Sequence, residues 1–196
     1  MIINSIFQGA KNVLSQPSGT TKIDIALNRT GDAPHPVEPI APNTGINTLQ
    51  ANSSTDSIAD CVDQENNATG VGFAQTAGGS TANVGGSECS DSRFAQAHMC
   101  DGFQYCSTTP NEYTISGLDA SEEVDLYFFC SQGFWTTGAM KIEANAVEIV
   151  ASFETRFNTD IKEALGVSAD GSGNIVIKIA TTETYSVLNV MGINRS

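Results

Sequence analysis

Basic residues are scarce in this sequence: nine Lys and Arg stand against 22 Asp and Glu in 196 residues, for a net charge of -13. Nucleic acid and anionic membrane surfaces are bound through clustered basic residues, so we expect neither as a partner. The sequence also contains no run of 18 apolar residues, and a transmembrane helix is therefore not expected. The acidic excess lies in residues 51–196, because residues 1–50 hold three basic and three acidic residues.

Residue types that carry catalysis are equally sparse. The two histidines, His35 and His98, lie apart, and no G-x-S-x-G nucleophile motif is present. Glu122 and Glu123 stand together at the start of a predicted strand, where a solvated strand end is a commoner role than an acid and base pair. The sequence therefore predicts a protein that is not an enzyme, with no catalytic residue and no cofactor.

The five cysteines are Cys61, Cys89, Cys100, Cys106 and Cys130. Because the number is odd, at least one is unpaired within the chain, and the sequence leaves the pairing open. Together with His98, the middle three lack the paired C-x2-C spacing of zinc sites. The turn at 170–174 offers oxygen ligands for calcium but no downstream bidentate Glu, so we expect a hairpin turn and no metal site.

The most informative stretch runs from Tyr113 to Gly138. Val124, Leu126, Phe128 and Cys130 alternate with other residues at the period of a strand that has one buried face. Cys130 shares that phase, which predicts a buried thiol. Gly117 and Asp119 supply turn residues before this strand. The loop after it carries Phe134 and Trp135.

Further strands are expected throughout the chain, which gives an all-β fold. The candidates are 22–27, 58–62 with a second strand ending at Phe73, 112–116, 123–130, 138–144, 146–151, 160–164, 174–180 and 185–194, the last buried on both faces. Four prolines make 28–48 an extended irregular segment, and the composition of 76–92 predicts a long surface loop. No fixed-period repeat is visible.

Four ordered segments carry a family resemblance: Tyr113–Asp119, Val124–Ser131, Gly166–Ile177 and Leu188–Ile193. Together they resemble galactose-binding-like jelly-roll modules, which occur beside bacterial carbohydrate-active enzymes and in phage structural proteins. The resemblance covers about residues 55–194 and implies a jelly-roll β-sandwich. Such modules commonly carry an Arg just after the core strand, where this sequence has Ser131, Gln132 and Gly133. That departure argues against sugar binding.

The N-terminal residues have a different pattern. Apolar residues recur at helical spacing and end before Pro17; they are Ile3, Ile6, Phe7, Ala10, Val13 and Leu14. A helix this short needs a surface to pack on, either its own domain or a partner. We therefore divide the chain into an N-terminal docking arm at 1–19 and a jelly-roll domain at 20–196.

Two functional hypotheses follow from the sequence. The first is a structural virion protein of a tailed phage, a capsid decoration (cement) protein or a tail or fibre component. It would be made in the host cytoplasm without a signal peptide, form a homo-oligomer, and bind other virion proteins through the arm. The alternative is a carbohydrate-binding module that recognises glycans or cell-surface polysaccharide, with Phe134 and Trp135 as the candidate contacts.

Overall fold

The computed structural model describes residues 20–28, 45–50, 56–78, 80–82, 103–106, 109–133, 139–181 and 186–196. Within these residues every regular element is a strand, and no helix is long and apolar enough to cross a membrane. The docking arm lies outside the described residues, so its helical pattern and the domain boundary at 19/20 remain predictions.

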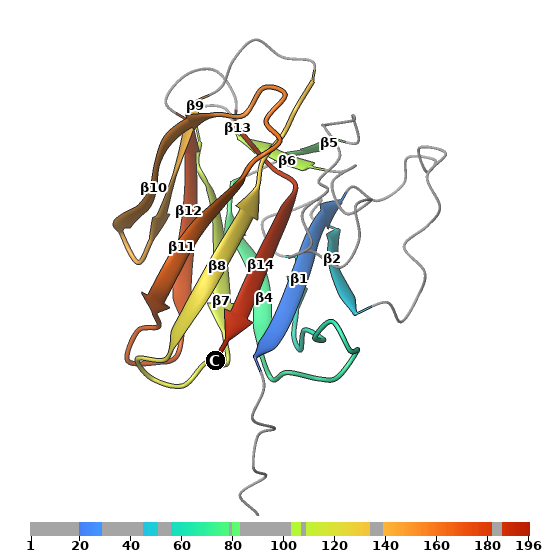
Figure 1. The fold of residues 1–196 in the computed structure, drawn as a ribbon, viewed down its shortest axis with the longest axis vertical. Helices are drawn as coiled ribbons and strands as arrows, with labels where there is room; N and C mark the ends of the chain where they lie inside the picture. Colours follow the sequence, from blue (N-terminus) through green and yellow to red (C-terminus); the bar gives the residue numbers. More distant parts are fainter. Residues whose placement is uncertain are drawn as a thin grey trace, which may run out of the picture.

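Two large sheets face each other to form a sandwich (Figure 1). Sheet A has the order β11 (Ile161–Ser168), β8 (Glu123–Phe129), β14 (Val190–Arg195), β1 (Thr21–Asn28) and β2 (Ile46–Gln50). Sheet B has the order β10 (Val147–Glu154), β9 (Ala139–Ala144), β12 (Ile175–Thr181), β7 (Asn111–Ser116), β4 (Gly72–Ala77) and β3 (Ser57–Ile58). A small sheet of β13 (Ser186–Leu188), β6 (Phe103–Cys106) and β5 (Ser80–Ala82) lies at the upper end. The predicted all-β jelly-roll sandwich is confirmed.

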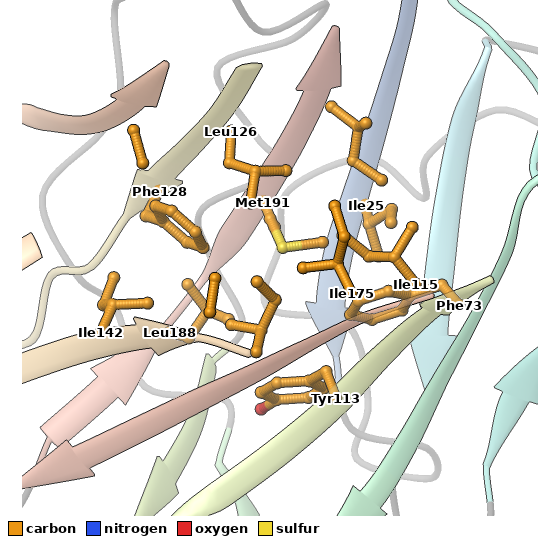
Figure 2. Close-up of a cluster of buried hydrophobic side chains, with 14 of the residues drawn as sticks. Ile25, Phe73, Tyr113, Ile115, Leu126, Phe128, Ile142, Ile175, Leu188 and Met191 are labelled. Atoms are coloured by element: carbon orange, nitrogen blue, oxygen red, sulfur yellow. The ribbon is translucent and has the colours of Figure 1, made fainter. Parts of the chain in front are cut away.

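The core fills the space between sheets A and B, and apolar side chains from both point into it (Figure 2). On β8 the predicted inward residues Val124, Leu126 and Phe128 are at most 2% exposed, and Cys130 is fully buried. Phe73 and Tyr113 stack with ring centroids 5.4 Å apart. Each buried side chain of this size contributes about 1.5–3 kcal/mol from its removal from water, which makes this core the main source of stability.

The turn after β7 carries the chain from one sheet to the other. β7 lies in sheet B and β8 in sheet A, so the two strands are not hydrogen-bonded to each other. Gly117 has a φ of +80°, and a Cβ there would lie 2.1 Å from the carbonyl oxygen of Gly70. Only glycine fits this close approach, which explains the turn residue that the sequence predicted.

Several strand predictions need correction. The 76–92 segment is not wholly a loop, because β4 continues to Ala77 and β5 forms at Ser80–Ala82. β4 runs from Gly72 to Ala77, whereas the predicted strand ended at Phe73, and β6 was not expected. The Pro-rich segment ends in β2, which pairs in parallel with β1. The closing strand is interrupted at Asn189, although it is buried on both faces as predicted.

One ion pair joins chain segments at the lower end of the sandwich. The Nε and Nη2 atoms of Arg195 donate to the two carboxylate oxygens of Glu122 at 2.7 and 3.0 Å, and Nη1 donates to the carbonyl of Thr69 at 3.1 Å. The Arg195 side chain is 11% exposed and that of Glu122 17%. Glu122 is therefore not the solvated residue that we expected. The hydrogen bond from Arg195 holds the pKa of Glu122 below its ordinary value.

Glu122→Gln is expected to destabilise the fold by about 2 kcal/mol at neutral pH, because it removes charge-assisted hydrogen bonds. Since the pKa of Glu122 is lowered in the folded state, its contribution is present above the ordinary glutamate pKa and is lost as the pH falls through the folded value. The difference in unfolding free energy between wild type and variant, measured by urea titration, should therefore shrink in acid. Glu123→Gln, at the exposed neighbouring position, is the control; an equal loss in both variants would contradict the assignment.

Candidate ligand-binding site

The candidate site lies at the upper end of the sandwich, where β8 ends and β10 connects to β11 (Figure 1). Phe129, the last residue of β8, pairs with Ile161, the first residue of β11. Beyond the strands, Gln132 and Arg156 form an isolated parallel bridge. We call Gln132, Arg156, Phe157 and Asn158 the Phe157 site.

Backbone hydrogen bonds join the two segments of the site. The amide of Gln132 donates to the carbonyl of Thr155 at 3.1 Å, and the amide of Phe157 donates to the carbonyl of Gln132 at 2.9 Å. The Asn158 side chain adds a third link, since its Nδ2 donates to the carbonyls of Cys130 at 3.0 Å and Asp160 at 2.8 Å. These bonds fix the 155–160 connection against the end of the core strand.

Buried polar residues support the site from below. Ser131, Thr155 and Asn189 are fully buried, and Gln132 is 1% exposed. The Asn189 side chain accepts a 2.7 Å hydrogen bond from the amide of Ser131. Because a buried unpaired amide costs about 1–3 kcal/mol, this bond holds the chain in one conformation as it leaves β8.

Phe157 combines a strained backbone conformation with an exposed aromatic side chain. Its φ is +52°, a left-handed conformation that costs a residue with a side chain roughly 1–2 kcal/mol. Its side chain is nonetheless 58% exposed, so burial of the ring does not account for the strain. Strained residues of this kind cluster at functional sites, and the observation therefore points to a role for the ring.

Arg156 lies against the ring of Phe157. Its Cζ atom is 5.2 Å from the ring centroid, within the range of a cation–π interaction. Among the described residues, no acidic group forms an ion pair with Arg156. Chemically, the site offers an exposed apolar ring face and a guanidinium with five N–H donors in a fixed plane. A ligand with a flat apolar face and several oxygen acceptors matches that combination.

The sequence did not predict these residues. Positive φ is typical of Gly and Asn, so nothing in the letters around Phe157 signals its conformation. The only local indication was an Arg-Phe pair in a polar connection between two predicted strands. Arg156 comes from a different segment, the 155–160 connection, and bridges to Gln132, one of the three residues that follow the core strand where the family commonly has an arginine.

The Phe157 site, as defined above, includes none of the residues that the sequence singled out as candidate contacts. Phe134 and Trp135 follow Gly133 directly but lie outside the described residues, so their role as glycan contacts remains a prediction. A turn at 170–174 is confirmed, with the Oδ1 atom of Asp170 accepting from the amides of Ser172 at 2.8 Å and Asn174 at 2.9 Å. It is not the expected hairpin turn, because it joins β11 in sheet A to β12 in sheet B. Within the described ranges, no group of three or more His, Cys, Asp and Glu side chains could hold a metal ion.

The cysteine predictions are confirmed where the structure describes them. Cys130 is fully buried, as its position in the strand pattern predicted, and Cys61 is fully buried as well. Burial raises the pKa of Cys61 to about 12, with a smaller contribution from Asp60. Since the thiolate is the reactive form, Cys61 is not a candidate nucleophile.

Comparisons with known proteins give similarity at the level of fold. No family model matches the chain, and no curated protein matches it. The structure of Bacteroides uniformis β-glucuronidase 2 covalently bound to cyclophellitol-6-carboxylate aziridine superposes with a TM-score of 0.54 and 12% identity, over 89% of this chain and 18% of the β-glucuronidase chain. A calcium-binding mutant of the same enzyme gives a TM-score of 0.55 with the same identity and coverage.

A family 35 carbohydrate-binding module from Clostridium thermocellum matches 64% of this chain and 98% of its own, with 14% identity and a TM-score of 0.36. The match to the β-glucuronidase covers only about a fifth of that enzyme's chain. At the level of fold, the predicted resemblance to jelly-roll modules found beside carbohydrate-active enzymes is confirmed.

The strain at Phe157 can be tested with two truncations that both remove the ring. Phe157→Gly should be more stable than Phe157→Ala by about 1 kcal/mol, because glycine adopts positive φ without a steric cost. At a residue with ordinary φ the order is reversed. Urea unfolding of both variants measures the difference, and Ala164→Gly on β11 is the control for the ordinary order. A more stable alanine variant at 157 would show that the backbone there is unstrained.

Proposed function

We propose that this chain is a non-catalytic carbohydrate-binding module and that Phe157 is the ring on which a sugar stacks. The observation that carries the proposal is an exposed aromatic side chain held in a strained backbone at the end of the sandwich. A sugar ring has an apolar face of C–H groups and a rim of hydroxyls. It therefore fits an aromatic face beside a hydrogen-bond donor.

Preorganisation supports the same function. The three hydrogen bonds that join Gln132, Phe157 and Asn158 to their neighbours are all made between groups of the protein itself. Binding then needs little ordering of the loop, and less of the interaction energy is lost to conformational entropy. A rigid scaffold with a ligand-contacting loop at its end is a common arrangement for recognition.

The proposal does not include catalysis. Apart from Arg156, the ionisable side chains nearest in sequence to Phe157 are Glu154 and Asp160, both exposed at the surface. Neither is held in the buried environment that is typical of a general acid. The chain's resemblance to part of a β-glucuronidase extends to fold alone, and we do not transfer that enzyme's activity to it.

The virion hypothesis depends on residues 3–14, which lie outside the described residues. The similarities reported above add no support for it. The docking arm, the homo-oligomer and the virion location remain predictions from the sequence, while the glycan-binding alternative has a candidate site.

Loss of the ring should weaken glycan binding. Phe157→Ala is expected to lower affinity about tenfold or more, equivalent to about 1.4 kcal/mol, whereas Phe157→Trp should retain binding. A glycan array identifies a bound sugar and isothermal titration calorimetry gives the dissociation constants. Leu165→Ala, which truncates another exposed apolar side chain on β11, is the matched control. The proposal fails if wild type binds no glycan, or if the two alanine variants bind equally well.

A further inference from the structure

We infer that the Phe157 site selects sugars that carry an acidic group, a carboxylate or a sulfate ester, and that Arg156 binds this group. The inference rests on the proposed function and adds a ligand class to it. It is carried by a guanidinium that is exposed, held beside the proposed stacking ring, and without an acidic partner among the described residues.

Arg156 differs from the three described basic residues that form ion pairs. Lys141 and Lys178 both contact the carboxylate of Glu143, at 2.6 and 3.9 Å, and Arg195 binds Glu122. The chain has more than two acidic residues for each basic one, so acidic partners are plentiful. Arg156 contacts an aromatic ring instead, and its N–H donors are left for another acceptor.

Both the backbone and the side chain of Arg156 contact neighbouring groups. The backbone of Arg156 bridges to Gln132, and the amide of the next residue, Phe157, donates to the carbonyl of Gln132. The ring then holds the side chain by a contact of 5.2 Å. A planar guanidinium that is already placed loses little freedom when it forms two parallel hydrogen bonds to a carboxylate or sulfate.

The negative net charge of the protein favours acidic sugars over acidic molecules that lack a sugar ring. An acidic ligand is repelled by the body as a whole, and Glu154 and Asp160 are the exposed acids nearest in sequence. Charges beyond about 8 Å are largely screened at physiological ionic strength, so the short contact with Arg156 dominates once the sugar is bound. An acidic molecule without a sugar ring gains no stacking on Phe157 and is disfavoured.

Lys162 provides an internal comparison. Its Nζ atom lies 5.2 Å from the ring centroid of Phe153, a second cation–aromatic contact on the β10–β11 edge. Phe153 is half-buried and packs against the core, whereas Phe157 is largely exposed. Lys162 thus has the same charge as Arg156 on the same edge of the sandwich, but its aromatic partner has a structural role.

The test compares methyl glucoside, methyl glucuronide and glucose 6-sulfate by calorimetry. Wild type should bind at least one acidic sugar about tenfold more tightly than the neutral one, a difference of about 1.4 kcal/mol. Arg156→Gln should remove this preference, because it weakens acidic-sugar binding more than neutral-sugar binding, while the urea midpoint stays unchanged. Arg156→Lys should keep only part of it, because the ammonium cannot bind through two parallel bonds. Lys162→Gln, which removes the same charge nearby, should keep it.

The two acidic probes distinguish the carboxylate from the sulfate source. Equal affinity of wild type for neutral and acidic sugars would overturn the inference and leave the proposed function intact. So would an acidic preference that survives in Arg156→Gln or disappears equally in Lys162→Gln, since the latter is a general charge effect. Absence of binding to any sugar on the array would instead reject the proposed function, and the inference with it.

Discussion

The backbone groups that follow β8 must find hydrogen-bond partners in a place without water, and the upper end of the molecule is built around this requirement. Ser131 finds its partner in the Asn189 side chain, Gln132 in Thr155, and Cys130 in Asn158. A buried orphan group would cost about as much as a whole hydrogen bond contributes. Asn189, just before β14, and the 155–160 connection both supply these hydrogen-bond partners, so the two segments meet at the end of β8.

The candidate site follows from that arrangement. Because 155–160 is tied to 130–132 by its own backbone, the turn has little freedom to relax the left-handed φ of Phe157. The core beneath supplies the stability that tolerates such strain. Arg156 then completes the surface with the one described arginine that has no carboxylate partner. The architecture and the proposed binding site are thus linked through the hydrogen bonds at the end of a single strand.

The sequence predicted the features that depend on local pattern. Alternation gave β8 and its inward side chains, and the glycine at 117 marked the change of direction before it. The sequence did not predict contacts between residues that lie far apart along the chain. Glu122 and Arg195 are 73 positions apart, β2 pairs in parallel with β1, and a single buried asparagine splits the last strand. The site was missed for the same reason: the conformation of Phe157 is imposed by residues on another segment.

The pairing of Thr21 with Arg195 places the two ends of the sandwich side by side at the lower end. Paired residues lie about 5 Å apart, so a short peptide could join residue 196 to residue 20 without disturbing sheet A. β8 separates this junction from the Phe157 site by seven residues, or roughly 20 Å. The domain is thus suited to circular permutation, or to insertion into a surface loop of a carrier protein with the proposed binding site turned outward.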